Sequence, residues 1–369
     1  MTEFAKRVTS IDISGIRKMF EAAGPNAISM GLGQPDFDTP ENIKQAAIKA
    51  IAEGKTGYTN NAGIDELRAA VADKLARENG LHFAPKNILI TAGGSGALHA
   101  AICSLIEDGE KVVFNNPGFV SYGSLATLAG GKPDPVPLRP DLHLDVEALK
   151  EHFADKKTKV MVLNSPANPT GMVETPATIR AVVEAAADSG VTVLSDEVYE
   201  KFCYGDTKFV SAGTFGDNVV TINAVSKTYA MTGWRVGFMA GDESIISQAV
   251  KVQQYSLACP TSIAQYAALE AYTGDQSSIE VMRREYEARR NLLISGLKDM
   301  GISVAMPEGA FYAFPKLDLE TTMKIVAADV IITPGSAFGS LGNGYARMSY
   351  AASQKNIAEA LKRIQKVVE

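Results

Sequence analysis

The sequence predicts an α/β fold in three layers, in which helices cover both faces of a mostly parallel central sheet, together with a smaller α+β domain. From about residue 88 to 240, short β-rich apolar segments alternate with segments of helical periodicity, as in successive βαβ units. The apolar segments are nearly continuous, as expected for strands covered on both faces. At 369 residues, the chain is too long for one small core, which favours two domains.

Six segments are predicted to be strands of the central sheet, and helical segments lie between several of them. The helix predicted over 175–190 has a Thr-Pro start at Thr175 and Pro176 and a stop at Gly190, both typical of helix boundaries. The predicted strands are 87–91, 111–114, 159–164, 191–196, 218–223 and 236–240.

The two ends of the chain differ from its middle. Residues 1–45 contain loops and the turn-rich segment GLGQPDFDTP, and a long amphipathic helix is predicted after about residue 271. Ser277 and Glu280 have the spacing of a capping box at its start. We therefore predict a large domain over 46–271, and a small domain formed by 1–45 and 272–369.

Composition excludes several functional classes. The net charge of −6, without a basic stripe, argues against nucleic acid as a partner. No segment approaches the length of a membrane span, and the N-terminus lacks a signal-peptide pattern. Three widely spaced cysteines fit a reducing compartment, so we expect a cytoplasmic protein. The four histidines show no metal-ligand spacing, and we expect no metal. These residues are Cys103, Cys203, Cys259, His82, His99, His143 and His152.

Ligands of open α/β sheets bind at the carboxyl ends of the strands, so the polar residues there are the candidates for a site. Gly94, Ser95 and Gly96 follow the first predicted strand and open a helix, where free N–H groups can bind phosphate. A tight turn is an equally good interpretation of these glycines alone. Phe119 follows the second strand and is either an exposed aromatic or a core residue. Asn168, in NSPANPTG, is a turn residue or an amide directed into a cleft.

Charged residues at the next strand ends are harder to explain structurally. Asp196 ends a buried strand and Tyr199 lies three residues on, and a buried carboxylate needs a partner unless it caps a helix. Lys227, next to Ser226, follows another strand, and Arg235 lies between glycines. A desolvated lysine forms Schiff bases with carbonyls, and arginine binds phosphate bidentately.

One ligand satisfies all of these groups. Its phosphate would meet the glycine-rich helix start and Arg235, its aldehyde Lys227, and its protonated ring nitrogen Asp196. Its phenolic oxygen would accept from Tyr199 and Asn168, and its ring would stack on Phe119. That ligand is pyridoxal 5′-phosphate.

At this point a family resemblance is clear. The chain resembles fold-type I pyridoxal-phosphate enzymes of the class I/II aminotransferase family, through NSPANPTG, SDEVY and SKTYAMTGWRVG. The resemblance extends from GLGQPDFDTP to GYARMSYA and is strongest to archaeal enzymes for aspartate or aromatic amino acids. It implies transfer of an amino group from such an L-amino acid to a 2-oxo acid such as 2-oxoglutarate.

The resemblance also implies a role for each site residue. Lys227 would be the Schiff-base lysine, and Asp196 the partner of the ring nitrogen. Arg347 would hold the substrate α-carboxylate, with the backbone of Gly33 beside it. Tyr58 would reach the phosphate of a neighbouring subunit, which implies a homodimer with shared sites. The remaining groups would be Tyr199 and Asn168 at the phenolic oxygen, and Ser226, Arg235, Gly94, Ser95 and Gly96 at the phosphate.

The chain departs from this family in three places. Ala224 stands where many relatives have a hydroxyl residue at the phosphate. The segment 254–266 has no arginine, so no anchor for an acidic substrate side chain is visible there. The segment between FPKLD and VIITPG is several residues shorter than in relatives.

Three other functions remain open from the sequence. A lyase, racemase or decarboxylase of the same fold could use the same lysine. A regulator that binds pyridoxal phosphate without turnover is a second alternative. A nucleotide-binding module is a third, based on the glycine-rich turn alone, but it leaves Lys227, Asp196 and Arg235 unexplained.

Overall fold

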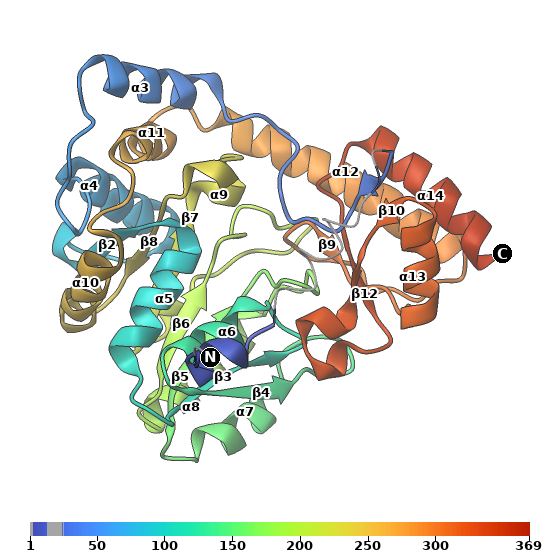
Figure 1. Ribbon diagram of the computed structural model, residues 1–369, viewed down its shortest axis with the longest axis horizontal. Coiled ribbons are helices and arrows are strands. Elements are labelled where there is room, and N and C mark those ends of the chain that lie inside the picture. Colours follow the sequence, from blue (N-terminus) through green and yellow to red (C-terminus); the bar gives the residue numbers. More distant parts are fainter. Residues whose placement is uncertain (1–2, 13–23, 25) are drawn as a thin grey trace.

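The computed structural model describes residues 3–12, 24 and 26–369, and its centre is a seven-stranded sheet (Figure 1). The strand order is β2-β8-β7-β6-β5-β3-β4. All neighbours are parallel except β8, which runs antiparallel to both β2 and β7. This confirms the predicted α/β fold with a mostly parallel sheet. The strands are β2 (Ile88–Thr91), β3 (Lys111–Asn116), β4 (Lys132–Pro137), β5 (Thr158–Asn164), β6 (Thr192–Asp196), β7 (Val219–Ala224) and β8 (Gly237–Ala240).

The edge strand β4 was not predicted. Its sequence, KPDPVP, has proline at every second position, and proline cannot donate to a sheet ladder. Within the described structure β4 pairs only with β3, so its free edge needs no such donors. Proline is tolerated in β4 for that reason. The prolines also interrupt the run of apolar residues from which the other strands were predicted.

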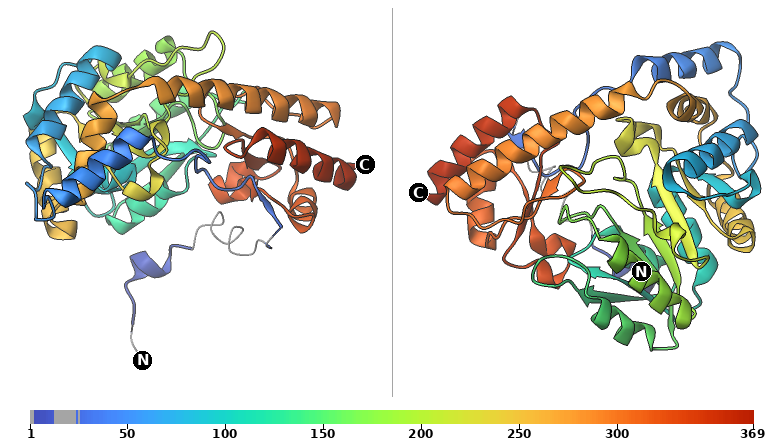
Figure 2. Two further views of the ribbon diagram at one scale, coloured as in Figure 1. Left: turned by 90° about the horizontal axis from the view of Figure 1, so that it is seen from above. Right: turned by 180° about the vertical axis from the view of Figure 1, so that it is seen from behind.

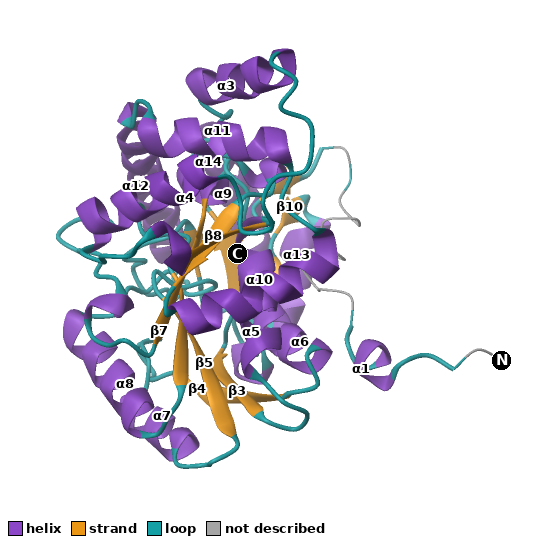
Figure 3. Cartoon of the chain, turned by 90° about the vertical axis from the view of Figure 1, so that its left-hand side faces the viewer, coloured by secondary structure: helices purple, strands orange, loops and turns teal. Residues whose placement is uncertain are grey.

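Helices cover both faces of the sheet (Figure 3), because successive side chains of a strand point to opposite sides. Val160 and Val162 of β5 pack in a core with helices α5, α6 and α10. Met161 and Leu163 of the same strand pack with α7 and α8. The helices are α5 (Gly93–Leu105), α6 (Ser121–Leu128), α7 (Val146–Phe153), α8 (Pro176–Asp188) and α10 (Glu243–Leu257).

A third core lies against β2 and β8, with helices α3 (Glu41–Ala52), α4 (Asp65–Lys74) and α11 (Ser262–Thr273). Ile43 of α3 belongs to this core, and α3 packs against α11. The short helix α9 (Val225–Thr228) follows β7 directly. The division of the chain at residues 45 and 271 stays a prediction.

The C-terminal part of the chain forms a further core with the segment around Ile28 and with Tyr199, Phe202 and Tyr204, which follow β6. Here β11 (Thr333–Pro334), β12 (Ala346–Ser349) and β9 (Tyr312–Ala313) form a small antiparallel sheet, and β1 (Ile28–Ser29) pairs with β10 (Val330–Ile331). Figure 2 shows helix α12 (Ser277–Asp299) running from the central-sheet region to this core, alongside α14 (Gln354–Val368). The other helices are α13 (Leu319–Ala327) and, near the N-terminus, α1 (Lys6–Thr9).

The two predicted helix starts differ in outcome. The start at Thr175 is confirmed, since its side chain accepts a hydrogen bond from the N–H of Thr178 and Pro176 is the first helical residue. The capping box at Ser277 is wrong: Ser277 is already helical, and its hydroxyl donates to Asp275. Glu280 instead binds Arg283 and Arg284 within the helix, and ion pairing with these neighbours replaces the capping contact.

Candidate active site

A cavity of about 640 Å³ opens at the carboxyl ends of β3, β5, β6 and β7, within the size range of small-molecule sites. Most of the predicted site residues line it, and they come from both ends of the chain as well as from the central sheet. These residues are Gly33, Gly94, Ser95, Phe119, Asn168, Asp196, Tyr199, Ser226, Lys227, Arg235 and Arg347.

Lys227 is held in this cavity by helix α9, directly after β7. Its Nζ donates a hydrogen bond of 2.6 Å to the carbonyl oxygen of Gly33. Burial, together with the positive charges of Arg347 and Arg235, lowers the pKa of the Lys227 amine to about 8. The neutral amine, which a nucleophile or a base requires, is therefore more populated near neutral pH than in an ordinary lysine.

Asp196 ends β6 and is buried. Burial raises the pKa of its carboxyl group to about 6, although a hydrogen bond from Tyr122 acts in the opposite direction. The Tyr122 hydroxyl donates to Oδ2 over 2.8 Å, and its ring packs edge-on against Phe119. Sequence reasoning missed Tyr122. The feature of the sequence that could have identified Tyr122 is its position three residues after Phe119 in the same segment.

Tyr199 and Tyr312 meet at the far wall of the cavity, with their hydroxyl oxygens 2.8 Å apart. Both rings are buried, and burial raises the pKa of both phenols. Tyr312 was not predicted. It belongs to strand β9 of the small sheet, and no motif in its neighbourhood marks it as different from the aromatic core residues beside it.

Arg347 is almost completely buried, at 1% exposure. Its guanidinium lies between the rings of Tyr312 and Phe338, 4.6 Å from each ring centroid. It donates to Asn168 Oδ1 over 2.9 Å and to the carbonyl of Gly31. Its Nε has no hydrogen-bond partner among the described residues. A buried, oriented guanidinium with a free donor is suited to bind a ligand carboxylate.

Arg235 lies beside the start of α5. It adopts a left-handed conformation with φ 56°, and its guanidinium donates to the carbonyl of Thr232 over 2.9 Å. A Cβ on Gly93 would lie 2.6 Å from Nη2 of Arg235, so glycine is required for this approach. No side chain caps the start of α5 in the described structure, and its N–H groups together with Arg235 form a site for an anion.

Two predicted residues lie outside the cavity wall. Gly96 is in the first turn of α5 but does not line the cavity. Tyr58 is 92% exposed and lies in a separate depression with Cys259 and Pro260. Ala224, where relatives have a hydroxyl residue, does line the cavity.

Substitution of Gly33 by alanine is expected to disturb the site from the N-terminal side. A Cβ at this position would lie 1.9 Å from the Tyr312 hydroxyl, so Tyr312 must move and its contact with Tyr199 must break. We expect the catalytic efficiency, kcat/KM, to fall about tenfold or more, as for other misplacements of site groups. In a Tyr312→Ala background the same substitution should have little further effect; equal losses in both backgrounds would contradict this explanation.

Comparison with known proteins agrees with this geometry. A family model described as aminotransferase class I and II matches residues 25–364. The chain belongs to this family. It is 43% identical to a probable aspartate aminotransferase of Methanocaldococcus jannaschii, over 99% of this chain and all of the relative. It is 41% identical to aromatic-amino-acid aminotransferase 2 of Thermococcus litoralis, over 98% of this chain and 97% of the relative.

Solved structures of aminotransferases have the same fold. Aspartate aminotransferase from Thermus thermophilus with maleate superimposes with a TM-score of 0.95, at 33% identity, over all of both chains. This aminotransferase is therefore a pyridoxal-phosphate enzyme. The cavity fits that cofactor, because it combines an amine of lowered pKa, a buried carboxylate and an anion site at a helix start.

Among the residues that the structure describes, no group of three or more histidine, cysteine or acidic side chains is arranged to hold a metal ion. In the same residues, no helix has both the length and the apolar character needed to cross a membrane.

Proposed function

We propose that the chain transfers the amino group of an aromatic or dicarboxylic L-amino acid to a 2-oxo acid such as 2-oxoglutarate. The observation that carries this proposal is a single cavity holding both the Lys227 amine and the buried Arg347 guanidinium. Lys227 would act at the amino nitrogen and the Cα atom of the substrate, and Arg347 would bind the α-carboxylate next to them. The names of the relatives, which include aspartate and aromatic aminotransferases, support the same substrate class.

Pyridoxal phosphate, when bound, supplies an electron sink for the negative charge that develops at the substrate Cα. Asp196 would pair with the ring nitrogen, and its position at the buried end of β6 fixes that charge. The N–H groups of Gly94 and Ser95 would hold the phosphate with Ser226 and Arg235. Tyr199 and Asn168 would bind the phenolic oxygen, and Phe119 would cover one face of the ring.

Lys227 and Arg347 would act on the substrate itself. Arg347 would bind the α-carboxylate with the donors that the protein leaves available, and thereby orient the Cα–H bond. The Nζ of Lys227 would accept the proton from Cα and keep it within the cavity for return. The lowered pKa of the Lys227 amine favours the neutral form that this step requires.

The lining of the cavity favours an aromatic side chain over an acidic one. Among the described residues of the lining, the cations are Lys227, Arg235 and Arg347, and each has a proposed role elsewhere. Leu32 and Val120, by contrast, add apolar surface.

Rates with aspartate, phenylalanine, tyrosine, alanine and kynurenine against 2-oxoglutarate test this proposal. Formation of glutamate distinguishes an aminotransferase from a lyase, a racemase or a regulator without turnover.

Replacement of Arg347 by alanine is expected to raise KM for the amino donor about a hundredfold, since two charge-assisted hydrogen bonds to the carboxylate are lost. Cofactor affinity, measured by absorbance titration, should change much less. Arg347→Lys keeps the charge but loses the planar fork, and should recover only part of the loss. Loss of cofactor with normal KM would place Arg347 at another part of the ligand.

We also propose a cytoplasmic homodimer with shared active sites. The exposed ring of Tyr58 supports this, because it is available to reach the phosphate site of a partner chain. None of the three cysteines, all in the described part of the chain, forms a disulfide. Sedimentation at several protein concentrations, for the protein and for Tyr58→Ala, tests the assembly and the sharing of sites.

A further inference from the structure

The segment that follows β6 has two functional sides. Asp196, Val198 and Tyr199 line the cavity. Glu197 and Glu200 belong to the same segment but do not line the cavity, yet they are only 1% and 7% exposed. Two buried carboxylates directly behind the cofactor groups have no role in the mechanism above.

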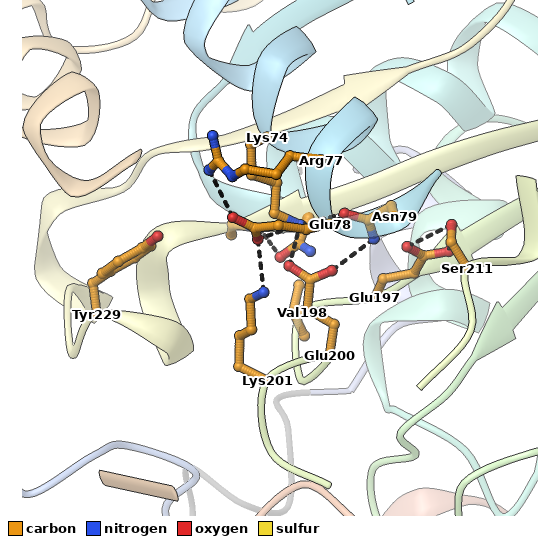
Figure 4. A network of polar contacts seen from close by, with 12 residues as sticks. Lys74, Arg77, Glu78, Asn79, Glu197, Val198, Glu200, Lys201, Ser211 and Tyr229 are labelled. Carbon is orange, nitrogen blue, oxygen red and sulfur yellow. Dashed lines mark hydrogen bonds and ion pairs between the residues drawn. The ribbon is translucent and has the colours of Figure 1, made fainter. Parts of the chain in front are cut away.

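Glu200 is held by two side chains of the neighbouring helix (Figure 4). Lys74 donates to its Oε1, and the Nδ2 of Asn79 donates to its Oε2 over 2.8 Å. Lys74 also donates to Asn79 Oδ1 over 2.7 Å. All three side chains are buried, so each polar atom depends on this triangle rather than on water.

The helix that supplies Lys74 and Asn79 has an irregular end. Helix α4 continues into a π-helical turn over Leu75–Asn79, which ends at Gly80 with φ 69°. Such wide turns are rare and frequently occur at functional sites. Here the turn brings two residues that are five positions apart to the same carboxylate.

The segment is also fixed at its start. The N–H of Glu197 donates to the carbonyl of Ile222 in β7. Its side-chain Oε1 accepts from Ser195 Oγ, Ser211 Oγ and the N–H of Ala212, at 2.9, 2.8 and 3.2 Å. Burial, with repulsion from Glu200 as a second cause, raises the pKa of the Glu197 carboxyl group to about 7.

The backbone connects this network to the cavity. The N–H of Glu200 donates to the carbonyl of Glu197, and the N–H of Phe202 donates to that of Tyr199. These bonds form one compact turn, so the Glu200 side chain fixes the position of the whole segment against α4. Asp196 and Tyr199 lie within or next to this turn.

We propose that Glu200, through its contacts with Lys74 and Asn79, is a positioning residue for the two cofactor groups Asp196 and Tyr199. The inference rests on the proposed roles of Asp196 and Tyr199 at the ring nitrogen and phenolic oxygen. Small displacements of such groups have large effects on rate. Loss of the network therefore changes the electronic environment of the bound cofactor although no network residue touches it.

The test is Glu200→Gln in the holoenzyme. Glutamine keeps the size of the side chain but removes its charge, which leaves the buried Lys74 with only the more distant Glu78, at 3.9 Å, as a counter-ion. We expect kcat to fall about tenfold, and the pH midpoint of the bound cofactor's visible absorbance to shift by about half a unit or more. KM for the donor should change little, because Arg347 is not displaced.

Asp134→Asn is the matched control. Asp134 pairs with Lys111 at the edge strand β4, so this variant loses a partly buried ion pair away from the segment. It should lower the melting temperature without moving the absorbance midpoint. If Glu200→Gln behaves like this control, its role is only structural and the proposal is overturned.

A second variant keeps the test decisive if Glu200→Gln does not fold. Glu200→Gln combined with Lys74→Met removes both charges, and we expect it to recover stability while the absorbance midpoint stays shifted. Recovery of the wild-type midpoint together with stability would overturn the proposal. The wild-type protein separates a failure of the proposed function from a failure of this inference. If the wild type shows no cofactor absorbance, the proposed function is contradicted and the role of Glu200 is not what failed.

Discussion

Replacement of Lys227 by alanine is expected to abolish transamination with every amino donor, a loss of more than about a thousandfold in kcat. Among the described residues, Lys227 is the only lysine that lines the cavity, and burial lowers the pKa of its amine. No neighbouring amine can replace it. The measurement is glutamate formation from 2-oxoglutarate, together with borohydride reduction and peptide mapping of the cofactor adduct.

Lys208→Ala serves as the control, since Lys208 is an exposed lysine in the same half of the chain. This variant should be as active as the wild type and should carry the reduced adduct on the Lys227 peptide. Full activity of Lys227→Ala, or an adduct on another peptide, would defeat the assignment.

Replacement of Asp196 by alanine is expected to lower kcat by about a hundredfold or more, because a charge-assisted bond to the cofactor ring is lost. The buried position of Asp196 strengthens this effect, since water cannot replace the carboxylate. Stopped-flow absorbance of the half-reaction with the donor measures the chemical step directly.

The structure offers a control for the side effects of that substitution. Asp196→Ala also leaves the hydroxyl of Tyr122 without its acceptor. Tyr122→Phe removes only that hydroxyl, and we expect it to lower kcat by much less. Equal losses in the two variants would assign the effect to the Tyr122 contact instead of to the cofactor.

The sequence was sufficient for the fold and for the residues at strand ends. Lys227 and Asp196 could be selected because charged residues at or just after the ends of apolar strands need a structural reason, whereas Asn168 taken alone was equally well explained as a turn residue. Their common edge follows from the parallel topology alone. The edge strand β4 could not be found, because its three prolines resemble a loop when its free edge is unknown.

Residues whose function depends on tertiary contacts were beyond sequence reasoning. Tyr312 is one of several aromatics in a core segment, and only packing brings its hydroxyl to Tyr199. Glu200 looks like an ordinary exposed glutamate until Lys74 and Asn79 are placed around it. In both cases the partner is more than a hundred residues away in the sequence.

The reversed direction of β8 has a consequence for how this enzyme can vary. The chain leaves the sheet at the end of β7, passes Lys227 and Arg235, and re-enters through β8 at the same edge. If β8 were parallel to β7, the chain would have to cross to the other end of the sheet first. Arg235, which precedes β8, would then lie at the opposite edge of the sheet from Lys227. The residues proposed to bind the aldehyde and the phosphate thus lie in one short connection between two strands. An insertion or deletion between residues 225 and 236 is therefore expected to disturb both proposed contacts at once.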